Sequence, residues 1–314
     1  MTELKDKIQN GLDESRMLIL GAQILVGFAF RSVFEAAFPS LTKIAQNLNL
    51  IALTLLLLTL CLLIWPAAFH QIVERGRDTI GLHRFTTRAM EVALALFALG
   101  LGVGTYIPAE EIAGRSVGTI FAIGMMGVAL LFWYGPFLLK ALRKTATKKG
   151  TPVNSIESEP VSSTSVHDKI RHVLTEARVV LPGNQALMGF QFTVILQQGF
   201  RDLPPSLKIV HLASLSLIAI STILLLTPAP YHRIVEEGEE TEGFYSVANK
   251  LVLSALPPMA AGICCDFFLV VYKTTTRWNA SLAAAIAMFL LFCALWFGYT
   301  IFRRTQLRGA PRST

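Results

Sequence analysis

Apolar residues along this chain occur in long unbroken runs, separated by shorter polar segments. A bilayer core about 30 Å thick needs roughly 20 apolar residues for each spanning helix, and continuous runs of that length predict membrane helices rather than alternating strands. Eight segments meet this length: residues 17–38, 48–69, 89–107, 117–139, 179–200, 209–229, 247–271 and 280–302. The pattern therefore predicts an all-α, polytopic integral membrane protein with eight transmembrane helices.

Composition agrees with this class. Only 16% of the 314 residues are charged and 53% are hydrophobic, whereas about a quarter of the residues in a typical soluble domain are charged. The four cysteines lie inside predicted spans without metal-ligand spacing, so we interpret them as small packing residues. Because Walker A, HExxH and nucleophile-elbow motifs are absent from the sequence, we expect no enzyme activity, no metal and no cofactor.

Basic residues gather at the ends of the predicted helices. The net charge is +7, but this placement indicates orientation in a lipid bilayer, and we expect no nucleic-acid partner. If the chain begins in the cytoplasm, that side of the membrane receives 21 of the 28 Lys and Arg residues. The positive-inside rule then predicts a multi-pass protein of the cell inner (plasma) membrane with both termini cytoplasmic.

One phrase of the sequence occurs twice. PAAFHQIVERGRDT at residues 66–79 returns as PAPYHRIVEEGEET at residues 228–241, 162 positions later. The same offset, without a gap, aligns Gly21, Gln23 and Leu25 with Gly183, Gln185 and Leu187. An internal repeat of this length predicts a duplicated four-helix unit. Since each unit has an even number of spans, both copies should enter the membrane in the same direction, as parallel repeats.

The repeat divides the chain into three parts. Residues 1–144 and 169–314 are the predicted first and second four-helix membrane repeats. Residues 145–168 are rich in Ser, Thr, Pro and charge, with no hydrophobic periodicity. This composition predicts a flexible cytoplasmic linker.

Three short motifs recur in both halves: E-x-R, then G-x-Q-x-L with F-x-F beyond it, then P-x-x-x-H-[QR]. At these residues the chain resembles a family of uncharacterised bacterial integral membrane proteins, catalogued as the domain of unknown function 6328. Members of that family usually look like one four-helix unit, so the resemblance implies two fused units here and a bacterial source. Some members carry a sodium:proton antiporter label.

The first candidate site is a polar group at the predicted cytoplasmic surface, present in both halves. A histidine and a glutamate four residues apart share one face of a helix, and an imidazole beside a carboxylate could relay protons near neutral pH. The alternative is structural, with an arginine and a glutamate forming an interfacial ion pair that fixes a helical hairpin. The residues are Glu14, Arg16, His70 and Glu74, repeated as Glu176, Arg178, His232 and Glu236.

Other candidates lie inside the predicted spans. Gln23 and Gln185 either form interhelical hydrogen bonds or line a polar path shared by the two repeats. Arg31 and Glu35, one helical turn apart, form either a specialised site or an ion pair near the outer interface.

Asp266 lies deepest among the lone acids, and a membrane-embedded acid is a functional candidate. Its aligned position in the first half is Gly104. Any role of this carboxyl group would therefore belong to the second half alone.

Two classes of function follow from these residues. The chain is either a small proton- or cation-linked transporter or channel, with a polar path between the two repeats, or a non-transporting membrane protein that binds a protein partner or a lipid. The expected surroundings are the lipid bilayer, with an ion or a proton as the candidate substrate. The sequence leaves open whether the chain forms a homo-oligomer.

Overall fold

The computed structural model of the chain describes residues 2–74, 79–146, 166–236, 239 and 241–309. Within these ranges every regular element is a helix, which confirms the all-α prediction. The first half contains α1 (Thr2–Ser32), η1 (Phe38–Ser40), α2 (Lys43–Phe69), η2 (His70–Glu74), α3 (Ile80–Ala113) and α4 (Arg115–Ala146). The second half contains α5 (Val166–Val194), α6 (Gln198–Arg201), α7 (Pro205–Leu226), α8 (Pro228–Ile234), α9 (Glu242–Thr275), α10 (Trp278–Cys293), η3 (Ala294–Tyr299) and α11 (Thr300–Gly309).

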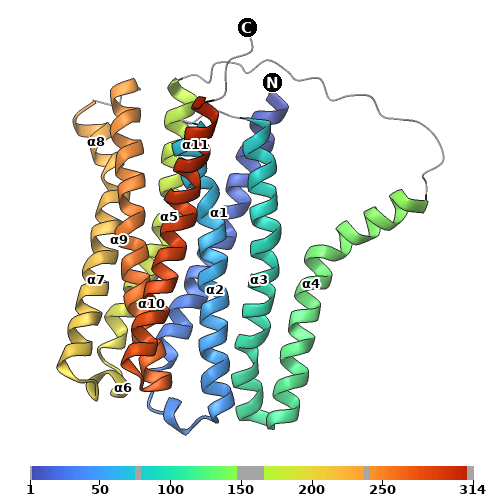
Figure 1. The fold of residues 1–314 in the computed structure, drawn as a ribbon, viewed down its shortest axis with the longest axis vertical. Helices are drawn as coiled ribbons and strands as arrows, with labels where there is room; N and C mark the ends of the chain where they lie inside the picture. The colour runs from blue at the N-terminus through green and yellow to red at the C-terminus, as the bar shows by residue number, and fades with distance from the viewer. Residues whose placement is uncertain (1, 75–78, 147–165, 237–238, 240, 310–314) are drawn as a thin grey trace.

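The long helices stand side by side along one axis (Figure 1). The start of α1 and the end of α11 lie at one end of the bundle, which we call the terminal end, and the turn between α3 and α4 lies at the opposite, distal end. Gly114 makes that turn at φ 84°, a left-handed conformation that glycine adopts without steric cost.

Six helices in the described ranges are long and apolar enough to cross a membrane: Lys43–Glu74, Arg84–Ala113, Arg115–Gly135, Pro205–Ile234, Glu242–Thr275 and Trp278–Gln306. Met17–Ser32 is apolar but shorter. The prediction of a polytopic membrane protein is therefore supported by six of the eight expected spans. The expected spans 17–38 and 179–200 are not among the six; in the structure α1 ends at Ser32 and α5 ends at Val194, each followed by a turn.

At the terminal end, one helix in each half begins after a threonine that caps it. The Thr79 hydroxyl accepts a hydrogen bond from the Leu82 backbone N–H at 3.0 Å and so caps α3. The Thr241 hydroxyl accepts one from the Phe244 backbone N–H at 2.9 Å and caps α9. A threonine cap stabilises a helix by about 1 kcal/mol.

Each half packs its own helices in chain order. In the first half, α1 contacts α2, α2 contacts α3 and α3 contacts α4; in the second, α5 contacts α7, α7 contacts α9 and α9 contacts α10. Between the halves, α1 packs along α5, and α2 meets η3 and α9. In Figure 1, α4 lies at the outer edge of the first half.

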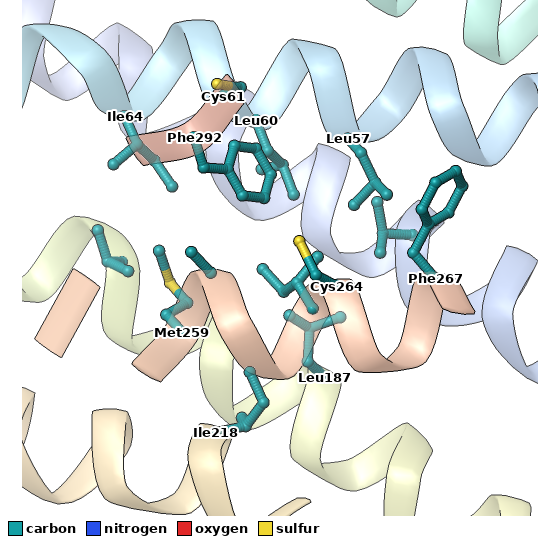
Figure 2. Packing of buried hydrophobic residues seen from close by; sticks show 14 of the residues in the cluster. Leu57, Leu60, Cys61, Ile64, Leu187, Ile218, Met259, Cys264, Phe267 and Phe292 are labelled. Carbon is teal, nitrogen blue, oxygen red and sulfur yellow. The ribbon is translucent and has the colours of Figure 1, made fainter. Parts of the chain in front are cut away.

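The core lies where α2 and α9 approach each other. Figure 2 shows Leu57 and Ile64 of α2 facing Cys264 and Phe267 of α9, with Leu187 of α5 beneath. Cys61 and Cys264 are buried free thiols within this cluster, in agreement with the predicted packing role. Because lipid is as apolar as these side chains, such a core is held by close packing and interhelical hydrogen bonds rather than by exclusion of water.

One hydrogen bond ties the last long helix of the chain to the second. Trp296, in η3, is buried and donates from its Nε1 to the Cys61 backbone carbonyl oxygen at 2.9 Å. Its ring also stacks on Phe292, with the ring centroids 4.9 Å apart. The two halves are therefore joined by a specific polar contact as well as by apolar packing.

Candidate functional site: a buried polar cluster around Asp266

Asp266 lies on α9, nine residues before the end of that helix at Thr275, which corresponds to about 14 Å from the distal end. The residue is 8% exposed and faces α5 and α7. Its Oδ2 accepts a hydrogen bond from Gln191 Nε2 on α5 at 2.8 Å. The deep acid predicted from the sequence is thus buried and anchored to a second helix.

Gln191 is the centre of a network that links three helices. Its Nε2 also donates to Ser214 Oγ on α7 at 2.7 Å, and that hydroxyl donates to the Gly262 carbonyl of α9 at 2.8 Å. The Gln191 backbone carbonyl lies 3.2 Å from His211 Nε2. Because a carbonyl oxygen only accepts, His211 carries its hydrogen on Nε2. We call Gln191, His211, Ser214 and Asp266 the Asp266 cluster.

Several polar atoms of the cluster have no hydrogen-bond partner among the described residues. They are Asp266 Oδ1, Gln191 Oε1 and His211 Nδ1. Each such buried atom costs about 1–3 kcal/mol. Three unsatisfied acceptors on neighbouring side chains therefore point to a small species that would satisfy them.

The cavity beside Asp266 has apolar walls. Asp266 borders a cavity of about 10 Å³ whose other walls include Phe30, Leu187 and Phe267. That space is at the lower limit for a single water molecule. His211 stacks on Phe30, with centroids 6.1 Å apart, and meets Phe200 edge-on at 4.9 Å. The arrangement has room for a proton, a water molecule or a small ion.

In the part of the chain that the structure describes, no cationic side chain pairs with Asp266. Lys273, two turns further along α9, donates instead to the Gly199 carbonyl at 3.1 Å and lies 5.9 Å from the centroid of the Phe34 ring. The negative charge of an ionised Asp266 would thus have no protein counter-ion in this arrangement.

Gln23 and Gln185 occupy different environments. Gln23 is 0% exposed and packs against Gly183 of α5, where a Cβ atom would lie 1.3 Å from its Oε1. Neither its Oε1 nor its Nε2 has a hydrogen-bond partner among the described residues. Gln185 is exposed. A shared polar path lined by both glutamines does not fit this arrangement.

Arg31 and Glu35 form an ion pair, with Nη2 and Oε1 3.0 Å apart and side chains 35% and 44% exposed. Since α1 ends at Ser32, Glu35 lies in the turn that follows the helix. With its amide oriented to satisfy both ends, Gln197 donates to Glu35 Oε2 at 3.0 Å and accepts from Arg31 Nη2 at 3.1 Å. The exposure and the position at the helix end fit an interfacial pair, whose contribution to stability is about 0–1 kcal/mol.

Next to this pair, the Gly199 backbone N–H donates to the Phe34 carbonyl at 2.9 Å. Arg31, Glu35 and Phe34 belong to the first half, whereas Gln197 and Gly199 belong to the second. We call these five residues the distal seam. The seam joins the two halves at the distal end of the bundle.

The repeated polar group at the terminal end is organised differently in the two halves. His70 is buried and Glu74 is half-buried, and both lie in η2, a π-helical turn. The chain stays helical through both residues, but η2 is a π-turn, whose hydrogen bonds run between residues i and i+5, rather than the α-helix that the prediction assumed.

The second copy departs further from the predicted relay. His232 packs against the Phe244 ring at 4.6 Å, and Glu236 accepts from the Thr241 hydroxyl at 2.9 Å. The helix α8 ends at Ile234, so Glu236 lies beyond the helix that carries His232 and shares no helical face with it. Of the remaining residues in this group, Arg178 is exposed, and the side chains of Glu14, Arg16 and Glu176 lie outside the described part of the structure.

Sequence reasoning identified Asp266 but did not single out Gln191, His211 or Ser214. A signal for Gln191, Ser214 and Asp266 was available in the repeat offset, because the matched positions of the first half hold alanine or glycine, whereas His211 aligns with another polar residue. At that offset, Gln191, His211, Ser214 and Asp266 align with Ala29, Asn49, Ala52 and Gly104.

Comparison with known proteins places the chain in a family. Neither a curated protein nor a solved structure matches it. A family model, described as a family of unknown function (DUF6328), matches residues 3–136 and again residues 163–300. The two matched segments together span most of the chain. They follow one another along the sequence, one in each half, as the internal repeat predicts. The chain therefore belongs to the family of unknown function DUF6328 and carries two successive matches to it.

Proposed function

We propose that this protein is a small proton- or cation-linked membrane transporter or channel and that the Asp266 cluster is its ion site. The observation that carries the proposal is the pair of unsatisfied oxygens, Asp266 Oδ1 and Gln191 Oε1, held on neighbouring side chains. A charge at membrane depth without a partner is costly. A proton on Oδ1, or a small cation between the two oxygens, removes that cost.

The chemistry of the site favours a small ion over an organic substrate. Carboxylate and amide oxygens are ligands suited to hard cations, and Asp266 Oδ1 and Gln191 Oε1 are one of each. The adjoining cavity of about 10 Å³ excludes anything much larger than a water molecule. This proposal keeps the site beside the interface between the two halves, because Phe30 of α1 and Leu57 of α2 line the adjoining cavity, but it takes the polar groups from the second half alone.

The architecture that we propose around this site has eight membrane crossings in two parallel four-helix units, both beginning and ending in the cytoplasm of a bacterial cell. Three observations support it. Both halves pack their helices in the same order, Thr79 and Thr241 cap equivalent helices, and α1 begins at the same end of the bundle at which α11 ends (Figure 1). At the distal seam, the Gln197 amide contacts Glu35, the residue aligned with it by the repeat.

The alternative is a non-transporting membrane protein that binds a protein partner or a lipid. In that case the hydrogen bonds among Gln191, Ser214 and Asp266 only hold α5, α7 and α9 together. The two functions differ in one respect. A structural network needs the hydrogen bonds of Asp266, whereas an ion site needs its ability to carry a charge.

Asp266→Asn separates these roles, because an amide keeps the size of the carboxyl group and an oxygen that accepts from Gln191, but it does not titrate. Wild-type protein, Asp266→Asn and the control Glu91→Gln, which changes an exposed acid of α3, would be reconstituted in liposomes containing a pH-sensitive dye. Proton flux would be followed under Na⁺ and K⁺ gradients, and size-exclusion chromatography would verify folding.

We expect flux with the wild type and Glu91→Gln and its loss with Asp266→Asn. Unchanged flux in the folded Asp266→Asn protein would refute the assignment of the site. If the wild type gives no flux under any cation gradient, the binding function is favoured instead.

A further inference from the structure

A groove of about 340 Å³ opens between α1, α2 and α3 in the first half. This volume falls within the range of small-molecule sites, about 300–1,000 Å³. Its walls include Leu25 of α1, Leu56 of α2 and Leu101 of α3, and Gly100 and Gly104 form part of its surface. We call it the α1–α3 groove. It is separate from the Asp266 cluster, which lies between α5, α7 and α9.

The groove and the Asp266 cluster occupy matched places in the two halves. Three of the groove residues, Ala29, Ala52 and Gly104, align at the repeat offset with Gln191, Ser214 and Asp266. In the second half, these longer side chains fill the space between the helices and bond to one another. In the first half, Ala29 and Ala52 carry only a methyl group and Gly104 carries only a hydrogen, so the same space stays open.

Polarity changes along the groove. Ser32, Asn49 and Thr105 line it near the distal end, and Leu25, Leu56 and Leu101 line its deeper part. The polar groups satisfy one another, since Ser32 Oγ donates to Asn49 Oδ1 at 3.2 Å and Asn49 Nδ2 donates to the Ala29 carbonyl at 3.2 Å. The deep wall therefore offers packing to an apolar ligand and no unmet hydrogen bond.

The depth of the groove matches one leaflet of a bilayer. Leu56 lies thirteen residues after the start of α2, and Leu101 lies twelve residues before the end of α3. At 1.5 Å per residue these positions are about 20 Å and 18 Å from the distal end, against about 15 Å for half of a hydrocarbon core. Phe28, at the edge of the groove, is 53% exposed, so the opening faces the lipid side of the bundle.

Beyond the distal end of the groove, the surface is charged. The Arg115 side chain is 64% exposed and lies 4.0 Å from Glu110, and Lys43 is also exposed. The charges at this surface are of both signs, so a ligand with a long apolar part in the groove and a headgroup that carries both a phosphate and an amine would meet suitable chemistry at both ends. A phospholipid has this form.

We propose that the α1–α3 groove binds one acyl chain of a membrane phospholipid, which enters from the leaflet at the distal end. The first half of the chain thus carries a lipid site at the position where the second half carries the Asp266 cluster. This site does not depend on ion transport, and its test has a readout that is independent of flux.

Gly104→Leu tests the proposal directly. Gly104 lines the groove and a Cβ atom there meets nothing within 4 Å, so the new side chain begins in open space and takes up part of the groove. Gly124→Leu on α4 is the matched control, because Gly124 is exposed and its Cβ position is equally open. Both changes replace a helical glycine and therefore alter helix propensity alike.

Each protein would be purified in detergent from bilayers of phosphatidylethanolamine and phosphatidylglycerol, and bound lipid would be counted by native mass spectrometry. We expect one retained phospholipid for the wild type and Gly124→Leu, and its loss for Gly104→Leu. Equal retention by all three proteins would overturn the proposal, and so would a wild type that retains no lipid. A wild type that is dimeric and lipid-free, with a monomeric Gly104→Leu variant, would assign the groove to a second copy of the chain.

A measurement on the wild type keeps the test valid if Gly104→Leu does not fold. Phosphatidylcholine with a diazirine in one acyl chain would be reconstituted with the protein and photolysed, and the labelled peptides would be mapped. We expect enriched labelling of peptides that contain residues 25–32 and 100–105. Labelling spread evenly over these peptides and α4 would refute a specific site.

Discussion

Gly199→Ala is expected to loosen the distal seam that joins the two halves. A Cβ atom at this position would lie 2.7 Å from the Phe34 carbonyl oxygen and 3.0 Å from the Phe34 Cα, distances at which the backbone must shift. The shift is resisted from both sides, because Gly199 donates to Phe34 and accepts from Lys273. Phe34 itself is fully buried.

The magnitude follows from two contributions. Overpacking at a tight site costs about 1–3 kcal/mol, and weakening one hydrogen bond costs about 0.5–1.5 kcal/mol. Together they lower the free energy of unfolding by about 1.5–4.5 kcal/mol. At about 2.1 cal/mol/K of unfolding entropy per residue, 1 kcal/mol corresponds to about 1.5 °C in Tm for 314 residues, so we expect Gly199→Ala to lower Tm by about 2–7 °C.

Gly189→Ala provides the comparison. Gly189 is exposed on α5, and a Cβ atom there meets nothing within 4 Å. The same substitution should therefore leave stability unchanged or raise it by about 0.5–1 kcal/mol. Both variants would be purified in detergent and unfolded thermally, with tryptophan fluorescence as the readout. Equal Tm values for the two variants would show that the seam does not restrain the bundle as its geometry indicates.

Two further predictions concern buried polar groups and helix caps. Gln23→Met should raise the free energy of unfolding by about 1–3 kcal/mol, because it removes an unsatisfied buried amide. The control Gln185→Met, at an exposed site, should change the free energy of unfolding by less than about 0.5 kcal/mol. A Gln23→Met protein that is less stable than the wild type in thermal unfolding would contradict this prediction. Thr79→Ala and Thr241→Ala should each lower stability by about 1 kcal/mol, because each removes one hydroxyl cap. A difference of more than about 1 kcal/mol between the two alanine variants would argue against equivalent roles in the two halves.

Long apolar runs in the sequence predict well that a helix is present, but they do not predict the residue at which the helix ends. Residues 33–38 are mostly apolar, so composition extended the first span through them. In the structure, Phe34 and Phe38 are buried within a turn instead. Hydrophobicity reports burial, and a buried turn has the same composition as a buried helix.

The site was predictable only in part for a related reason. Asp266 stands out as an acid in an apolar run. Its partner Gln191 lies 75 residues earlier in the chain, and the sequence alone does not show that two residues so far apart are in contact. The repeat also suggested equal roles for Gln23 and Gln185. That symmetry does not hold for these side chains, because Gln23 packs into the space left by Gly183 while Gln185 is exposed.

The hydrogen bond from Trp296 to Cys61 has a consequence for biosynthesis. Its two residues are 235 positions apart, and a ribosome adds roughly 5–20 residues per second. The Cys61 carbonyl and the neighbouring surface of α2 are therefore not covered by Trp296 until roughly 10–50 s after they are synthesised. During that interval, lipids or the insertion machinery must occupy the place of η3, and the nascent first half completes its packing only after Trp296 has been synthesised.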